Sequence, residues 1–98
     1  MIAIEIRHNG ELKATCGAET FQQLTAMLFV TQNGEKPPDC EVECMGLCPR
    51  DEKTEEILRW VKKRINFGDE VSFKVVQVES AQEPFDSQVI PKAINPRD

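Results

Sequence analysis

The stretch over residues 54–79 constrains the fold most, because the spacing of its apolar residues changes abruptly part-way along. Its first half has helical spacing through four apolar residues, namely Ile57, Leu58, Val61 and Ile65. Acids come before this run and bases after it, as the helix dipole favours. From Val71 onward, apolar and polar residues alternate as they do in a strand. The stretch therefore predicts a helix, a turn and a strand that pack against one another.

Residues 2–16 predict two amphipathic strands joined by a turn, since apolar and polar residues alternate on both sides of a His-Asn-Gly sequence. A two-residue turn would set the apolar Ile6 against Lys13 on one face. We therefore expect a three-residue loop, which pairs Ile6 with Leu12 and sets charges of opposite sign against each other on the other face.

A further helix is expected over residues 20–32, because the segment begins with the Thr-x-x-Gln form of a capping box and an Asn-Gly pair follows it. Cys40 and Cys44 then alternate with Glu41 and Glu43, which predicts a short edge strand with a charged outer face. The predicted fold class is α+β, in the order ββαβαβ. A mostly antiparallel four-stranded sheet is expected to carry both helices on one face.

A single domain is expected over residues 1–79, followed by a proline-rich arm over residues 80–98. Pro84, Pro91 and Pro96 fall in this arm, a density that disfavours regular structure. We expect the arm to pack along the domain or on a neighbouring subunit. No apolar run approaches the roughly 20 residues of a membrane span. No export signal precedes the first strand, so a cytoplasmic protein without membrane contact is expected.

Charge is unevenly distributed along the 98 residues. Residues 35–56 hold eight of the 17 acids and three of the 12 bases, so this segment carries the whole net charge of −5. Such a balance disfavours nucleic-acid binding, which needs a basic footprint. A basic protein surface suits the segment better as a partner. A solvated acidic loop that keeps the protein soluble is the simpler alternative.

Four cysteines form the one pattern that could indicate a metal: Cys16, Cys40, Cys44 and Cys48. The last three are spaced more widely than the C-x2-C pair of a zinc knuckle. On a strand, Cys40 and Cys44 would stand about 13 Å apart, too far to share one ion. We predict that Cys16, Cys40 and Cys44 fill space in the core, whereas Cys48, followed by Pro49, is an exposed thiol. No cofactor is expected.

No catalytic site is indicated by the sequence. His8 is the only histidine, and it is expected at a hairpin tip, away from Cys16 on the neighbouring strand. The carboxylates are expected in solvent instead of in a cleft that shifts their pKa values. The chain has no glycine-rich phosphate loop and no hydrolase motif. We therefore predict that it is not an enzyme.

Trp60 lies at the edge of the expected helix's apolar stripe, where it suits core packing or, beside Arg59, an interface anchor. Trp60 and Val61, followed by the Gly-Asp-Glu-Val sequence of residues 68–71, form a motif that resembles small bacterial proteins of no assigned function. The resemblance covers residues 55–86. It implies a helix, a turn and a strand, and no activity.

The predicted function is that of a noncatalytic protein-binding module whose acidic surface engages a basic partner. Immunity proteins, antitoxins and inhibitors of defence enzymes are the analogy for this function. The predicted partner-binding residues are Glu41, Glu43, Asp51, Glu52, Glu55, Glu56, Arg59 and Trp60. Two alternatives stay open. One is a domain that binds zinc or iron through its cysteines, and the other is a structural homo-oligomer, such as a homodimer, in which the arm reaches across to a second copy.

Overall fold

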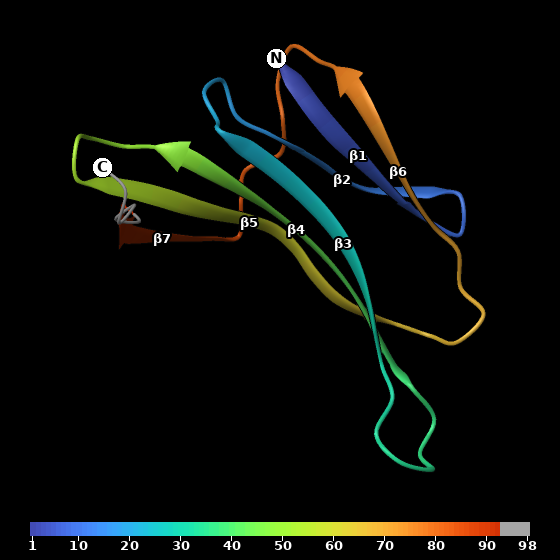
Figure 1. Ribbon diagram of the computed structural model, residues 1–98. Coiled ribbons are helices and arrows are strands. Elements are labelled where there is room, and N and C mark those ends of the chain that lie inside the picture. Colours follow the sequence, from blue (N-terminus) through green and yellow to red (C-terminus); the bar gives the residue numbers. More distant parts are fainter. Residues whose placement is uncertain (93–98) are drawn as a thin grey trace.

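The chain folds into seven antiparallel strands in two sheets, and the structure describes residues 1–92. The strands of this computed structural model are β1 (Ile2–His8), β2 (Glu11–Gly17), β3 (Gln23–Thr31), β4 (Asp39–Pro49), β5 (Thr54–Ile65), β6 (Val71–Gln77) and β7 (Asp86–Pro91) (Figure 1). The smaller sheet has the order β2-β1-β6 and the larger sheet the order β3-β4-β5-β7. Residues 1–92 include no helix that could cross a lipid bilayer.

The two sheets pack face to face, with β2 over β4 and β5 and with β1 over β3 (Figure 1). The core between them consists of Ile6, Ala14, Cys16, Val42, Cys44, Trp60 and Ile65. The sheets are offset, so β6 extends past β3 on one side and β7 extends past β2 on the other. A segment over residues 78–85 crosses between them, and the N–H of Gln82 donates to the carbonyl of Thr15 at 2.9 Å.

The predicted α+β architecture of order ββαβαβ is wrong, because both expected helices are strands. The second expected helix is β5, and a bulge explains why its sequence imitates a helix. Cys44 pairs with Val61 and Met45 pairs with Arg59, so Trp60 is an extra residue in the ladder. The bulge moves the inward phase by one position. Apolar residues that pack on the core are therefore spaced by three and four, as Leu58, Val61 and Ile65 show.

The first expected helix is β3, an edge strand of the larger sheet. Leu24 and Ala26 pack on the core, whereas Met27 and Phe29 fall on the opposite phase of the strand. Both faces are therefore apolar. A short continuous apolar run of this kind cannot be distinguished from a buried helix by its periodicity. Pairing with β4 makes this segment a strand, since the ladder runs without interruption from Gln23 to Thr31.

The β1–β2 hairpin is confirmed as two strands, but its predicted register is wrong. The turn has two residues, Asn9 at a φ of 51° and Gly10 at a φ of 82°, as a type I′ turn requires. Ile6 pairs with Ala14, and Arg7 pairs with Leu12. Lys13 is therefore bulged out of the ladder, which keeps its charge away from Ile6 without a longer loop.

The C-terminal segment contains a regular strand in spite of its prolines. β7 pairs along β5 from Asp86 to Pro91. It is the last strand of the larger sheet, and proline is tolerated at such an edge because its missing N–H leaves no ladder bond unmade. The expectation that residues 80–98 lack regular structure is therefore wrong for β7. Pro96 lies outside the described residues.

Candidate functional site

The outer face of the larger sheet carries the glutamates that the sequence analysis singled out. β4 is not an edge strand as predicted, because it lies between β3 and β5. Glu43 therefore points outward from the middle of the sheet, opposite Lys62. Its carboxylate oxygen Oε1 lies 3.8 Å from Nε of Arg59, whose Nη1 lies 3.4 Å from Oδ2 of Asp86. Cross-strand bases thus offset much of the negative charge of this face.

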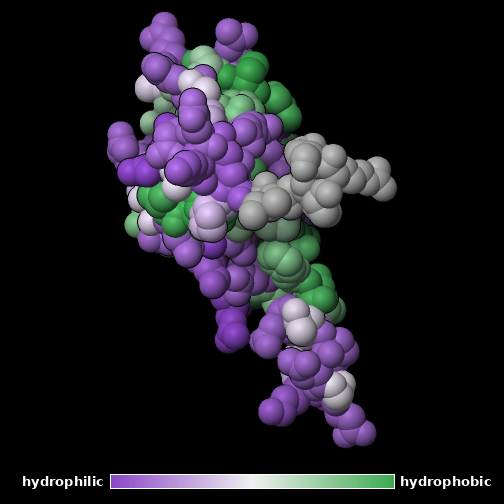
Figure 2. All heavy atoms as spheres, turned by 60° about the vertical axis from the view of Figure 1, so that its left-hand side comes forward, coloured by the Kyte–Doolittle hydropathy of each residue, from purple (hydrophilic) through white to green (hydrophobic). Residues whose placement is uncertain are grey.

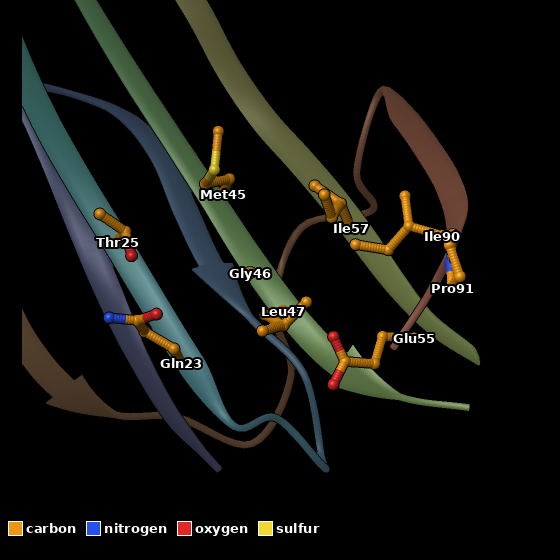
Figure 3. Close-up of a pocket in the computed structure, with 9 residues that line it drawn as sticks. All are labelled: Gln23, Thr25, Met45, Gly46, Leu47, Glu55, Ile57, Ile90 and Pro91. Carbon is orange, nitrogen blue, oxygen red and sulfur yellow. The ribbon is translucent and has the colours of Figure 1, made fainter. Parts of the chain in front are cut away.

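An apolar hollow of about 380 Å³ opens on the same face, toward β7. Four apolar side chains from three strands converge on it, namely Met45, Leu47, Ile57 and Ile90 (Figure 3). The strand ladders bring them together, since Leu47 pairs with Ile57 and Glu55 pairs with Ile90. Gln23, Thr25 and Glu55 supply the polar part of the lining. An outward sheet face usually alternates to polar residues, so this cluster is atypical.

Gly46 and Trp60 shape the sheet beneath the hollow. A Cβ at Gly46 would lie 3.0 Å from Cη2 and Cζ3 of Trp60, so the indole packs directly on the backbone of β4. The indole N–H donates to the carbonyl of Gln82 at 2.7 Å, which fixes the ring in place. Trp60 is 4% exposed and is a core residue, whereas its neighbour Arg59 lies on the outer face.

The structure divides the predicted partner-binding residues among three places. Those on the outer face are Glu41, Glu43, Glu55 and Arg59. Glu56 and Trp60 lie on the inward phase of β5, where Glu56 pairs with Cys48. Asp51 and Glu52 lie in the turn that joins β4 to β5.

Asp51 has a structural task in that turn. Its Oδ1 accepts hydrogen bonds from the backbone N–H groups of Lys53 and Thr54, both at 2.8 Å. The bond from the N–H of Lys53 is the main cause that holds the pKa of the Asp51 carboxyl below its usual range. The Asp51 side chain therefore closes the turn by binding backbone N–H groups of the same turn.

The apolar residues of the hollow were missed by the sequence analysis. Met45 and Leu47 continue the outward phase of Glu41 and Glu43, and this continuation is the one sequence signal that could have located them. Ile57 is predicted instead on the apolar stripe of a helix. The contribution of β7 could not be found from local sequence, because its pairing with β5 joins segments about 30 residues apart.

The cysteines mostly behave as predicted for core residues. Cys16 and Cys44 are fully buried and lie on opposite sheets. A hydrogen bond with the Cys44 sulfur, together with burial, raises the pKa of the Cys16 thiol. Cys40 is half-buried and packs against the same core. The prediction of an exposed Cys48 is wrong: it lies in β4, is 8% exposed, and burial raises its pKa. Within residues 1–92, no three potential metal ligands gather around a common point.

His8 joins the two turns at one end of the smaller sheet. Its Nε2 lies 2.7 Å from Oδ2 of Asp69, and the side-chain amide of Asn9 donates to Oδ1 of Asp69 at 3.1 Å. The contact with His8 is the main cause that lowers the pKa of the Asp69 carboxyl to about 2. The hairpin tip is therefore fastened to the turn that precedes β6.

No family model, curated protein or solved structure matches the chain. The resemblance to small bacterial proteins stays a prediction, and the helix that it implied is replaced by β5.

Proposed function

We propose that the protein is a noncatalytic protein-binding module that holds its partner on the outer face of the larger sheet. The observation that carries this proposal is the hollow of about 380 Å³, where four apolar side chains meet on a face open to solvent. An apolar patch with a polar rim is a usual mark of a protein interface. The hollow gives a partner's side chain a place where it can be desolvated, as anchor residues require.

The charges around the hollow indicate the chemistry of the partner. Arg59 lies near both Glu43 and Asp86. Within residues 1–92, no base forms an ion pair with Glu55, which lines the hollow directly. The rim is therefore negative at this point. A partner with an apolar side chain next to a lysine or arginine fits both features, because the apolar group fills the hollow while the cation meets Glu55.

The face continues along β4 to a second, more polar hollow of about 270 Å³. Phe29, Glu41, Glu43 and Lys62 are among the residues that line it. A partner laid along β4 would therefore contact an apolar anchor site at one end and mixed charges at the other. This proposal keeps the expectation of a basic partner. It differs in placing the main contact at the apolar hollow instead of the acidic segment. Inhibitor or immunity-type activity stays a prediction by analogy.

Selection of peptides from a random library, displayed on phage and panned on the full chain, tests the proposal. We expect the enriched peptides to share an apolar residue beside a lysine or arginine. Leu47→Glu should lower the affinity for these peptides at least about tenfold, because it places an unpaired carboxylate in the apolar site. Phe67→Glu is the matched control, since Phe67 is 84% exposed in the turn between β5 and β6 and gains the same charge.

Mapping by NMR locates the bound peptide on the protein. Shifts of backbone amide signals in β3, β4, β5 and β7 are expected on titration. Equal binding by wild type and Leu47→Glu would remove the proposal, as would shifts confined to the smaller sheet. A dimer of the free protein that Leu47→Glu dissociates would assign this face to a second copy instead.

A further inference from the structure

The sandwich is open along the side where β3 and β6 form the edges of their sheets. β1 lies over β3, so β6, the next strand of the smaller sheet, extends past the edge of the larger one (Figure 1). Phe73 and Val75 share the inward phase of Val71, which packs on the core. They are nevertheless 42% and 73% exposed. Their side chains therefore point inward from β6, and no strand within residues 1–92 lies beneath to cover them.

β3 contributes apolar side chains to the same open side. Leu28 and Val30 continue the inward phase of Leu24 and Ala26, and they are 49% and 63% exposed. β3 and β4 form a hairpin that extends beyond the rest of the molecule (Figure 1). Figure 2 shows hydrophobic surface where this hairpin leaves the body and hydrophilic surface at its tip. Among the described residues, nothing thus covers these inward-phase side chains of both sheets where the sandwich ends.

The free edge of β3 also lacks the features that keep sheet edges from pairing. At the other edges, β2 is bulged at Lys13, β6 carries Lys74 and β7 ends at Pro91. Residues 20–34, by contrast, include no charged residue and no proline. The ladder of β3 with β4 contains no bulge that would twist the edge away. Such an edge is a template for one more strand.

We propose that an extended, uncharged apolar segment of a partner protein adds as a strand beside β3 and beneath β6. Its main chain pairs with the free edge of β3, and every second side chain points toward Phe73 and Val75 and covers them. The absence of charge along β3 selects an uncharged segment. This site is separate from the hollow, which lies on the outward face of the same sheet.

A second copy that pairs antiparallel through its own β3 does not fit this position. If β3 of another copy paired beside β3, it would bring its own β1 with it, because β1 lies over β3 in each copy. That β1 would occupy the place over the added strand that β6 already holds. A bare segment avoids this clash in either strand direction, because it carries no covering sheet of its own.

A spin-labelled peptide tests the proposal on the full, ¹⁵N-labelled chain. The probe is as long as β3, nine residues, alternates valine and threonine, and carries a nitroxide at one end. We expect saturable broadening of amide signals in β3 and β6. Val75→Lys should weaken binding about tenfold or more, because it brings an unpaired charge to the apolar side of the added strand. Val75 is largely exposed, so this change leaves the folded core intact.

Two control variants show whether the loss of binding is specific to this edge. Phe67→Lys adds the same charge in an exposed turn and should bind the peptide like wild type. Leu47→Glu, which alters the hollow, should also bind it like wild type. Broadening confined to β2 or β7, no binding at all, or equal binding by Val75→Lys would overturn the proposal. Sedimentation that shows a dimer dissociated by Val75→Lys would overturn the choice of occupant in favour of a second copy.

Discussion

Gly46→Ala is expected to destabilise the fold because Trp60 already occupies the space that a side chain would need. The new Cβ would lie 3.0 Å from two carbons of the indole ring and 3.1 Å from Cδ2 of Leu24. Leu24 is flexible enough to yield. The indole is not, because its N–H is bonded to the carbonyl of Gln82 at 2.7 Å. Overpacking of this kind costs about 1–3 kcal/mol. For a domain of this size, that cost lowers the Tm by about 5–20 °C.

A double-mutant cycle with Trp60→Phe identifies the cause. The phenyl ring lacks the Cη2 and Cζ3 atoms that the new methyl group would meet. Gly46→Ala should therefore cost about 1 kcal/mol less in the Trp60→Phe background than in wild type. Guanidinium unfolding followed by far-UV circular dichroism measures all four proteins, since it does not depend on tryptophan fluorescence. An equal loss in both backgrounds would refute the packing of Trp60 on Gly46.

Three further results are expected. The pKa of Asp69 is about 2, below its usual value of 3.8, so the stabilisation by its contact with His8 is present above pH 4 and is lost as the pH falls toward 2. The difference in Tm between wild type and Asp69→Asn should therefore shrink over that range, and a constant difference would contradict the contact. Cys40 is the least buried thiol and should react first with a thiol reagent in the native protein, with all four thiols reacting only in denaturant; mass spectrometry that finds another cysteine labelled first would contradict the burial pattern. Gly10→Ala should cost about 1 kcal/mol or more, because Gly10 has a φ of 82° in the hairpin turn, and a stability equal to wild type in urea unfolding would exclude that backbone conformation.

The sequence predicted strands correctly where apolar and polar residues alternate, as in β1, β2 and the first half of β6. It failed for β5 because the bulge at Trp60 shifts the alternation and produces helical spacing. It failed for β3 because apolar residues on both faces remove the alternation altogether. In both cases pairing with neighbouring strands makes the segment a strand, and the local sequence does not identify those neighbours.

The candidate site was predictable only in part for the same reason. The outward phase of Glu41 and Glu43 follows from the local alternation of β4. The cross-strand bases that offset these acids become visible only when β5 is known to be a strand beside β4. The hollow depends further on β7, which pairs with β5 across a long stretch of sequence. Buried thiols, by contrast, were predicted for Cys16 from strand phase alone.

The position of the hollow depends most directly on residues Thr54–Ile65 forming β5, since this strand brings Glu55, Ile57 and Arg59 to the outer face. Nuclear Overhauser spectroscopy of the full, isotope-labelled chain tests this placement. We predict backbone contacts between Met45 and Arg59 and between the strands β5 and β7. Strong sequential amide–amide contacts throughout residues 54–65, typical of a helix, without those cross-strand contacts would contradict it.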